Sequence, residues 1–402
     1  MRICLCTSYF PPIIGGAENQ AARLASGLAR LGDEVSVVTR QIPGLPTREI
    51  WQGVRVYRVI RPGQRGPLFG LGYCLSLLAF FLRPGRRFDV VQVTRVHLGA
   101  YVACRLRRRL GYRVVVRPTG PGPDGDLASF AHMPFWPLWR GGDVPTRQHV
   151  LSTIQRADAF VALNRQIVAE LVEHGFPARR ILRIANGVPL VASPRDAEER
   201  RAERSRLGLG EGPVLLFVGQ LNRHKGADNV IGILPSLAQR FPGLTLVMLG
   251  GGPLREELAA LAESLGVSQE VRLLGESDPT PFLRVADVFV LPTQSEGMSN
   301  ALLEAMGGGL PCVATQVPGN VEIISHGQTG LLVEPGKPEE LAEAIGRLLA
   351  DPALRLRMGE AARQRVRDIY SVDTMVAAYR RLFERLVAGR GPLESGPEAA
   401  RV

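Results

Sequence analysis

Short β-branched apolar runs alternate with helix-forming segments through this 402-residue chain, and the alternation constrains the fold more than any other feature. It predicts parallel sheets covered by helices. Strands are expected at residues 2–7, 34–39, 89–93, 113–117 and 159–162 in the first half, and at 213–219, 244–250, 271–274, 286–291 and 311–314 in the second. Helices fill the gaps, for example at residues 18–31 and 254–265.

The length of the chain exceeds what one ordinary hydrophobic core needs. We therefore expect two doubly wound α/β domains facing a cleft, at residues 1–195 and 196–369, with the linker near the charged, Pro- and Gly-edged segment 192–212. A further helix is expected at residues 370–388, and a disordered tail at residues 389–402.

Positive charge is concentrated in the N-terminal half. The net charge is +11, and from Arg55 to Arg117 fourteen arginines stand against one acid, Asp89, so this stretch carries +13 and the remainder −2 (11 − 13). Nucleic acid, an anionic membrane surface and a phosphorylated acceptor would each be attracted to such a field, and a solvated arginine-rich surface is the structural alternative. Because no nucleic-acid reading motif is present, no specific nucleic-acid partner is expected.

The five cysteines show no paired pattern, and the strand-like start leaves no room for a signal peptide. A cytoplasmic protein is therefore expected. Cys4 and Cys6 would point to opposite faces of a strand, which favours core packing over a metal site.

The segment from the predicted strand at 286–291 to the helix-forming residues 301–306 is the most informative for function. Ser299 and Asn300 are favourable N-cap residues, so free backbone N–H groups near Gly297 and Met298 would favour an anion. Glu296 precedes this helix start, and Glu304 lies one turn inside it, where its carboxylate can accept hydrogen bonds from vicinal hydroxyls. The bare spacing of the two acids would also suit a capped helix with solvated glutamates.

Two cations and a glycine pair strengthen the functional interpretation. Lys225 is one of only two lysines among 49 basic residues, which indicates that a compact ammonium is needed after the strand at 213–219. Arg223 could contact the same anion. Gly15 and Gly16 lie between the first strand and the first helix, where backbone can approach a ligand closely.

These elements meet at the carboxyl ends of parallel strands, where open α/β sheets bind ligands. Two cations, a helix start and two hydroxyl-binding acids suit a nucleoside diphosphate sugar. Along nearly the whole chain the sequence carries, in this order, the motifs Gly15-Gly16-Ala17-Glu18, Asn186-Gly187-Val188, Val218-Gly219 with Lys225-Gly226, Gly250-Gly251-Gly252-Pro253, Ser295-Glu296-Gly297 through Glu304-Ala305-Met306, and Gly309-Leu310-Pro311. In these motifs it resembles the retaining family 4 glycosyltransferases.

The resemblance implies a GT-B fold of two Rossmann-like domains, with the donor bound mainly by the second and with the helix at 370–388 crossing back to the first. It implies that Glu304 holds the donor ribose, that Lys225 holds the diphosphate, and that Glu296 with the backbone of residues 297–300 holds the donor sugar. The donor contacts expected from the matched motifs are Gly15, Gly16, Asn186, Gly219, Gly297, Met298, Ser299, Asn300 and Glu304, with Glu296, Lys225 and Arg223 as the catalytic set.

The donor expected from this resemblance is a nucleoside diphosphate sugar, with a UDP-sugar favoured and a GDP-sugar as the alternative. The acceptor is expected to be a glycan or a lipid-linked group in cell-surface polysaccharide or glycolipid synthesis. No metal and no further cofactor are expected, because the cations and the helix start can neutralise the leaving diphosphate. One departure concerns Gln220, which stands where the family usually has arginine, and we expect Arg223 to replace that cation.

The acceptor side departs further from the family pattern. The loop after the strand at 113–117 lacks the histidine that the family often carries there, so His97, Thr119, Asp124 and Asp126 are the acceptor-side candidates. The apolar run at residues 68–82, flanked by arginines, is too short to span a membrane. It is expected either to rest on an anionic membrane surface or to be a buried helix of the first domain.

Two other functions fit parts of this pattern. A sugar-nucleotide epimerase of the same architecture would convert the donor without an acceptor, and a basic nucleic-acid-binding module would account for the charge alone.

Overall fold

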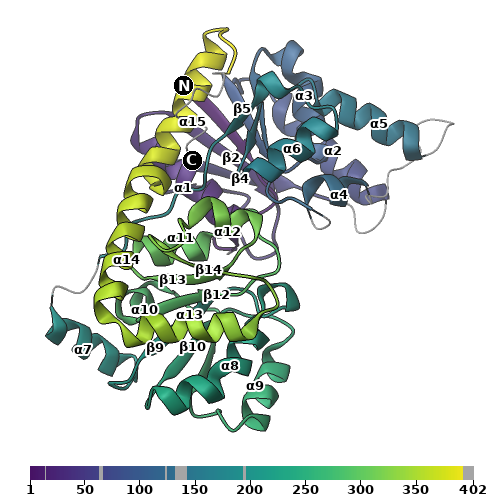
Figure 1. Ribbon diagram of the computed structural model, residues 1–402. Helices are drawn as coiled ribbons and strands as arrows, with labels where there is room; N and C mark the ends of the chain where they lie inside the picture. Colours follow the sequence, from purple (N-terminus) through teal and green to yellow (C-terminus); the bar gives the residue numbers. More distant parts are fainter. Residues whose placement is uncertain (14, 63–66, 123–124, 132–142, 193–195, 393–402) are drawn as a thin grey trace. The chain divides into compact units, whose positions relative to one another are not determined.

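The computed structural model describes residues 1–392 except 14, 63–66, 123–124, 132–142 and 193–195 (Figure 1). The chain forms two compact units, of which unit 1 comprises Met1–Gly187 and Val372–Val402 and unit 2 comprises Val188–Ser371. Of the tail predicted at 389–402, residues 393–402 lie outside the described part of the chain, as does the candidate Asp124. The predicted α/β class with two Rossmann-like parallel sheets is confirmed.

Unit 1 is built on an eight-stranded sheet with the order β3-β4-β2-β1-β5-β6-β7-β8, parallel except where β3 meets β4. The strands are β1 Arg2–Cys6, β2 Glu34–Arg40, β3 Arg48–Trp51, β4 Val54–Ile60, β5 Val90–Thr94, β6 Arg113–Arg117, β7 Ala159–Ala162 and β8 Ile181–Arg183. Its helices are α1 Gly16–Arg30, α2 Pro67–Phe81, α3 Leu98–Leu110, α4 Asp126–Ala131, α5 Asp143–Ile154, α6 Arg165–Glu173 and α15 Val372–Val387.

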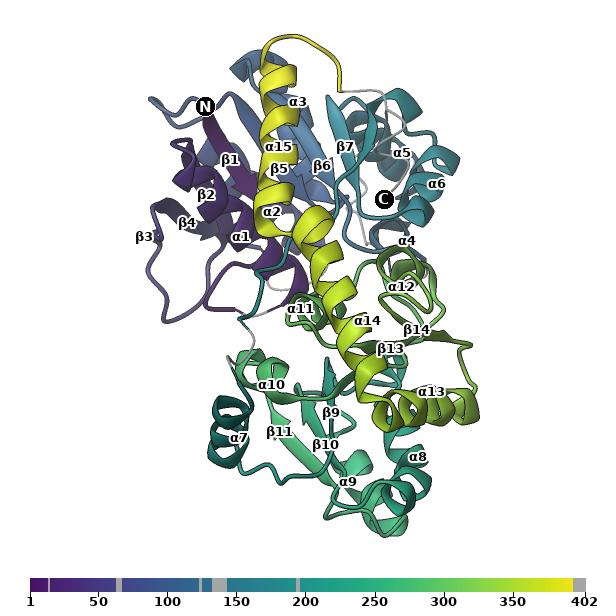
Figure 2. The same ribbon diagram turned by 60° about the vertical axis from the view of Figure 1, so that its left-hand side comes forward.

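Helix α15 packs along α1 and completes the core of unit 1 (Figure 2). Val376, Tyr379 and Phe383 are buried against Leu28 and its neighbours. The two helices approach closely because Gly27 has no side chain, and a Cβ there would lie 2.4 Å from Cγ2 of Val376. The last helix is therefore an integral part of unit 1.

Unit 2 contains a six-stranded parallel sheet with the order β11-β10-β9-β12-β13-β14. The strands are β9 Val214–Val218, β10 Thr245–Leu249, β11 Val271–Gly275, β12 Val288–Leu291, β13 Cys312–Thr315 and β14 Gly330–Val333. The helices are α7 Ala197–Arg206, α8 Ala227–Arg240, α9 Arg255–Ser264, α10 Thr280–Val285, α11 Asn300–Gly307, α12 Pro318–Ile323, α13 Pro338–Ala350 and α14 Pro352–Arg365. The strand order reverses between β9 and β12, which is where such sheets bind ligands.

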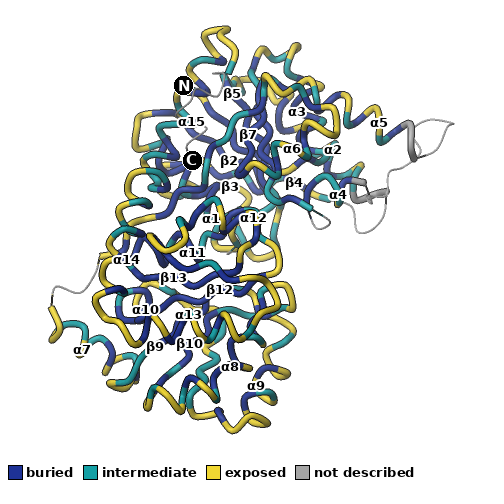
Figure 3. Tube along the Cα trace, viewed as in Figure 1, coloured by how far each residue is buried: buried dark blue, intermediate teal, exposed yellow. Residues whose placement is uncertain are grey.

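The central strands are buried on both faces, as the dark trace through each sheet shows (Figure 3). All four residues of β12 are buried, and Val214 to Phe217 of β9 are buried as well. Their continuous apolar sequence is typical of parallel strands covered by helices on both sides.

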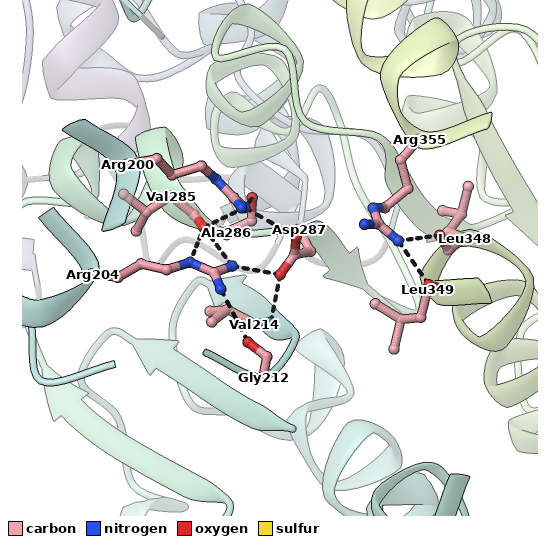
Figure 4. Close-up of polar contacts among 10 residues, drawn as sticks. All are labelled: Arg200, Arg204, Gly212, Val214, Val285, Ala286, Asp287, Leu348, Leu349 and Arg355. Carbon is pink, nitrogen blue, oxygen red and sulfur yellow. Dashed lines mark hydrogen bonds and ion pairs between the residues drawn. The ribbon is translucent and has the colours of Figure 1, made fainter. Parts of the chain in front are cut away.

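Helix α7 lies within the segment that we assigned to the linker, and a buried ion cluster holds it to unit 2 (Figure 4). Arg204 donates to Asp287 at 2.6 Å and to the carbonyl oxygen of Val285, and both charged side chains are 8% exposed. Arg200 lies 3.0 Å from the same carboxylate, which also accepts a hydrogen bond from Val214 N. Burial acts to raise the pKa of Asp287, but the two guanidinium groups and this hydrogen bond outweigh it and lower the pKa.

Candidate active site

Lys225 and Glu296 form an ion pair at the point where the strand order of unit 2 reverses. Lys225 ends the short helical turn Arg223–Lys225 after β9, and Glu296 lies in the loop after β12. The side chains are 25% and 10% exposed, so the pair is largely enclosed by protein and retains partial exposure to solvent. The structure thus joins two residues that the sequence assigned separate roles.

The loop that carries Lys225 is fixed by its own backbone. Asn222 caps the turn by accepting a hydrogen bond from Lys225 N at 3.1 Å. Gly226 follows with φ +66°, and a Cβ there would lie 2.2 Å from the carbonyl oxygen of Pro292. Only glycine therefore permits this loop to pack against the end of β12.

The loop that carries Glu296 is held from two sides. Its Thr293 side chain and Gln294 N both lie within hydrogen-bond distance of the His224 carbonyl oxygen, at 2.9 and 2.7 Å. On the other side, Gly319 of α12 packs so closely that a Cβ would lie 2.4 Å from the Glu296 carbonyl oxygen. These contacts set the position of the Glu296 carboxylate relative to Lys225.

Helix α11 begins directly after this loop. Ser299 is its N-cap and accepts a hydrogen bond from Leu302 N, as the sequence predicted. Met298 and Ser299 are buried, whereas Asn300 and Glu304 are partly exposed on the first turns of the helix. Partial positive charge at a helix start next to Lys225 creates a setting that suits an anion.

Two glycines after β10 support the same edge of the sheet. Gly250 has φ +137°, and a Cβ there would lie 1.9 Å from the Gly219 carbonyl oxygen. Gly252 has φ +156°, and a Cβ there would lie 2.4 Å from the Leu221 carbonyl oxygen. The glycine run at 250–252 therefore lets two loops pack backbone to backbone beside Gly219.

Arg223 shares the turn of Lys225 but pairs with an acid of another helix. Its side chain is 77% exposed and lies 3.3 Å from Glu257 of α9, and Gln220 is exposed. An exposed pair of this kind contributes little free energy, so the side chain can change partners at low cost.

In unit 1, the Gly15 and Gly16 turn begins α1 in the extended conformation. A Cβ on Gly15 would lie 2.2 Å from a carboxylate oxygen of Glu18. Asn186 is buried and accepts a hydrogen bond from Arg117, and the next residue, Gly187, exchanges two hydrogen bonds of 3.0 Å with the Gln20 side chain. Asn186 thus has a structural role at the edge of unit 1, which its predicted donor contact would add to.

A second polar cluster lies at the carboxyl ends of β5 and β6 and contains three of the acceptor-side candidates. Asp126 accepts hydrogen bonds from Thr119 N at 2.8 Å and from the Thr119 hydroxyl at 3.0 Å, and it lies 2.9 Å from Nε of Arg95. His97 caps α3 by accepting a hydrogen bond from Gly99 N, and its Nε2 lies 3.4 Å from the Tyr73 hydroxyl. Burial lowers the pKa of His97 to about 4, so its ring is neutral near pH 7.

Comparison with known proteins identifies the family. Residues 14–191 match the model described as Glycosyltransferase Family 4, and residues 199–365 match that of Glycosyl transferases group 1. Alpha-D-kanosaminyltransferase of Streptomyces kanamyceticus is 34% identical over 375 residues, which cover 88% of this chain and 91% of that protein. The chain belongs to the family 4 glycosyltransferases.

A further relative and a solved structure are similar to this glycosyltransferase over most of its length. The GDP-mannose-dependent alpha-(1-6)-phosphatidylinositol monomannoside mannosyltransferase of Mycolicibacterium smegmatis is 28% identical, with 96% of this chain and 98% of that protein covered. HepE of Anabaena, solved in complex with UDP, superposes with a TM-score of 0.72 at 19% identity and covers 96% of this chain and 100% of its own, so it is similar in fold. Of the three functions that fit the sequence, glycosyltransferase is confirmed.

Helix α2 of the glycosyltransferase is buried in unit 1 on one side and carries exposed leucines on another. Tyr73, Leu77 and Phe80 are buried in unit 1, whereas Leu71 and Leu75, one turn apart, are 51% and 55% exposed. Within the described ranges, no helix is long and apolar enough to cross a membrane. Over the same ranges, no group of three or more His, Cys, Asp or Glu side chains is arranged to hold a metal ion.

Two residues that shape the site could not be singled out from the sequence: Gly319 matters through its contact with the Glu296 loop, and Arg95 through an ion pair with Asp126. Gly226 belongs to one of the matched motifs, but its contact with Pro292 could not be predicted. The sequence does offer one signal for Gly319. It lies in the Pro-Gly-Asn run at 318–320, and proline after a strand such as β13 is typical of the first position of a helix.

Proposed function

We propose that this glycosyltransferase transfers a sugar from a nucleoside diphosphate sugar, with retention of anomeric configuration, to a glycan or lipid-linked acceptor in cell-surface polysaccharide or glycolipid synthesis. The observation that carries the proposal is the pairing of Lys225 with Glu296 at the strand-order reversal, beside the start of α11. A cation for a diphosphate and a carboxylate for sugar hydroxyls stand there together.

In the proposed complex, Lys225 moves from Glu296 to the donor diphosphate. The carboxylate of Glu296 is then free to accept hydrogen bonds from the donor sugar, together with the backbone of Gly297 and Met298. Glu304 accepts from the ribose hydroxyls, and Arg223 turns from Glu257 toward the diphosphate. The exposed Arg223 pair allows this turn, and the partial exposure of Lys225 leaves room for a phosphate oxygen.

The proposed reaction breaks the bond between the anomeric carbon and the leaving phosphate oxygen, and the acceptor hydroxyl attacks the same face of the sugar. Its proton passes to the leaving phosphate oxygen, so the products are the glycoside and the nucleoside diphosphate. Lys225, Arg223 and the helix start stabilise the charge that develops on the diphosphate, so the scheme does not require a metal.

For the donor base, a UDP-sugar is favoured and a GDP-sugar is the alternative. The UDP complex of HepE supports the first, and the GDP-mannose dependence in the name of the Mycolicibacterium smegmatis relative supports the second. The same relative's name includes a phosphatidylinositol monomannoside, which supports a lipid-linked acceptor.

The direct test is substitution of Lys225 and Glu296. Lys225→Ala and Glu296→Gln are each expected to lower turnover at saturating donor by about 10²- to 10³-fold, which is typical for loss of a group that stabilises transition-state charge. The matched control is Lys337→Ala, the other lysine of the chain, which is exposed before α13 and is expected to retain turnover. Near-normal turnover of Lys225→Ala would contradict the assignment.

We further propose that the enzyme works at the cytoplasmic face of a membrane and contacts it through α2. Leu71 and Leu75 are exposed along this helix, and exposed Leu82, Arg83 and Arg87 follow its end. Apolar side chains with adjacent arginines suit an anionic lipid surface. Flotation with vesicles containing anionic lipid tests this, because the double variant Leu71→Ser/Leu75→Ser should lose binding while the control Ile50→Ser, a leucine-sized exposed residue on β3, should keep it.

A further inference from the structure

Arg95 has an unusual backbone conformation at the carboxyl end of β5, a central strand of the unit 1 sheet. It follows β5 directly, and β5 pairs with β1 at the point where the strand order of this sheet reverses. Its φ of +78° lies in the left-handed region, which non-glycine residues rarely adopt and which is common at functional sites. Its backbone N–H donates to the Arg117 carbonyl oxygen at 2.8 Å, which fixes this conformation between β5 and β6.

The side chain of Arg95 is held in place at its inner end. Nε lies 2.9 Å from Oδ1 of Asp126, whose side chain is only 1% exposed and accepts two further hydrogen bonds from Thr119. The hydrogen-bonding capacity of the buried Asp126 carboxylate is therefore met by Thr119 and by Nε of Arg95. Its contact with Nε orients the guanidinium group and does not involve the two terminal nitrogens.

The outer end of Arg95 remains available. The side chain is 46% exposed, and across the described part of unit 1 its two terminal nitrogens have no hydrogen-bond partner. The other titratable group nearby, His97, is neutral near pH 7 because burial lowers its pKa to about 4. Arg117, beside it on β6, is buried and bonds to the neutral amide of Asn186, so the cluster of Arg95, Arg117 and Asp126 carries one net positive charge.

We propose that Arg95 binds a phosphate or phosphodiester group of the acceptor substrate, and this inference rests on the proposed glycosyl transfer. Two terminal nitrogens in a fixed plane match two phosphate oxygens, and the anchored side chain loses little entropy on binding. Arg95 selects acceptors that carry an anion over the corresponding neutral sugars.

The test compares three probes with the same ring size, glucose, glucuronate and glucose 6-phosphate, by isothermal titration calorimetry. UDP is present at saturation, so that the phosphate probe cannot occupy the donor site beside Lys225. Glucose 6-phosphate is expected to bind the wild-type protein about 10- to 100-fold more tightly than glucose, which corresponds to one charge-assisted contact. Tighter binding of glucuronate than of glucose 6-phosphate would show that the site prefers a carboxylate to a phosphate and would overturn the proposal.

Variants separate recognition from a structural ion pair. Arg95→Gln should abolish the preference for glucose 6-phosphate, and Arg95→Lys should retain part of it because the charge remains. Asp126→Asn should weaken the preference without removing it, since Arg95 stays but loses its charged anchor. UDP binding should be unchanged in all three variants. If the wild type binds neither UDP nor GDP, that result would instead count against the proposed function. An equal preference in wild type and Arg95→Gln, or none in the wild type, would overturn the role of Arg95.

Discussion

Asp287 is expected to be the most costly single charge to remove from unit 2. Its carboxylate accepts from Arg204 within a cluster in which both side chains are 8% exposed, so Asp287→Asn leaves a guanidinium group buried without its counter-ion. Loss of one partner of a buried pair typically costs about 3–5 kcal/mol. Unit 2 spans residues 188–371, which is 184 residues (371 − 188 + 1), and about 2.1 cal/mol/K of unfolding entropy per residue converts this loss into a fall in its melting temperature of about 8–13 °C.

Differential scanning calorimetry measures this fall, and two comparisons make it specific. Arg200→Met is the matched control, because its side chain is 36% exposed and its ion pair should contribute about 1 kcal/mol or less. The double variant Asp287→Asn/Arg204→Met should recover much of the loss, since no buried charge is then left unpaired. The sign with pH also follows: because the pKa of Asp287 is lowered in the folded state, its contribution is present above the ordinary carboxyl pKa and is lost as the pH falls through the folded value. A melting temperature of Asp287→Asn within about 2 °C of the wild type would refute the reasoning.

Three further predictions concern the site. Gly226→Ala should lower donor turnover at least about 10-fold, because the added Cβ would displace the Lys225 loop from Pro292. The control is Gly327→Ala, where φ is +78° and nothing lies within 4 Å of the added Cβ; it should change only stability, by about 1 kcal/mol. Proton NMR of the His97 ring should show no titration between pH 5.5 and 8, and stability should fall as the pH drops from 6.5 toward about 4, because the unfolded chain takes up that proton first. Treatment with EDTA should leave sugar transfer unchanged, and loss of turnover restored by a divalent cation would contradict the metal-free scheme.

The central strands of both sheets could be predicted from the sequence because buried parallel strands leave continuous apolar runs such as Val288–Leu291. The edge strands β8 and β14 and the hairpin of β3 and β4 are not among the predicted strands. In the hairpin, β3 is the edge strand, and the turn to β4 depends on positive φ at Gln52 and Gly53, without a strong turn signal. Helix α7 was taken as linker because it is highly charged, and only the buried Arg204 and Asp287 contact explains its position.

The candidate site was predictable where function is carried by consecutive residues. Ser299 could be recognised as an N-cap from its position before a helical segment, and the structure confirms it. The pairing of Lys225 with Glu296 could not be predicted, because it depends on β9 and β12 being neighbours although they lie about 70 residues apart. The same reason hid Arg95, whose partner Asp126 lies 31 residues away.

The central claim is that unit 2 binds a nucleoside diphosphate sugar through Lys225 at the β9 and β12 edge. A thermal-shift measurement with UDP, GDP and ADP on the wild type and Lys225→Ala tests it most directly. A diphosphate at 100 times its dissociation constant should stabilise the wild type by about 2.7 kcal/mol, a rise of about 7 °C for a unit of this size, and should shift the Lys225→Ala variant much less. No shift of the wild type by any of the three, or an equal shift of both proteins, would contradict the account.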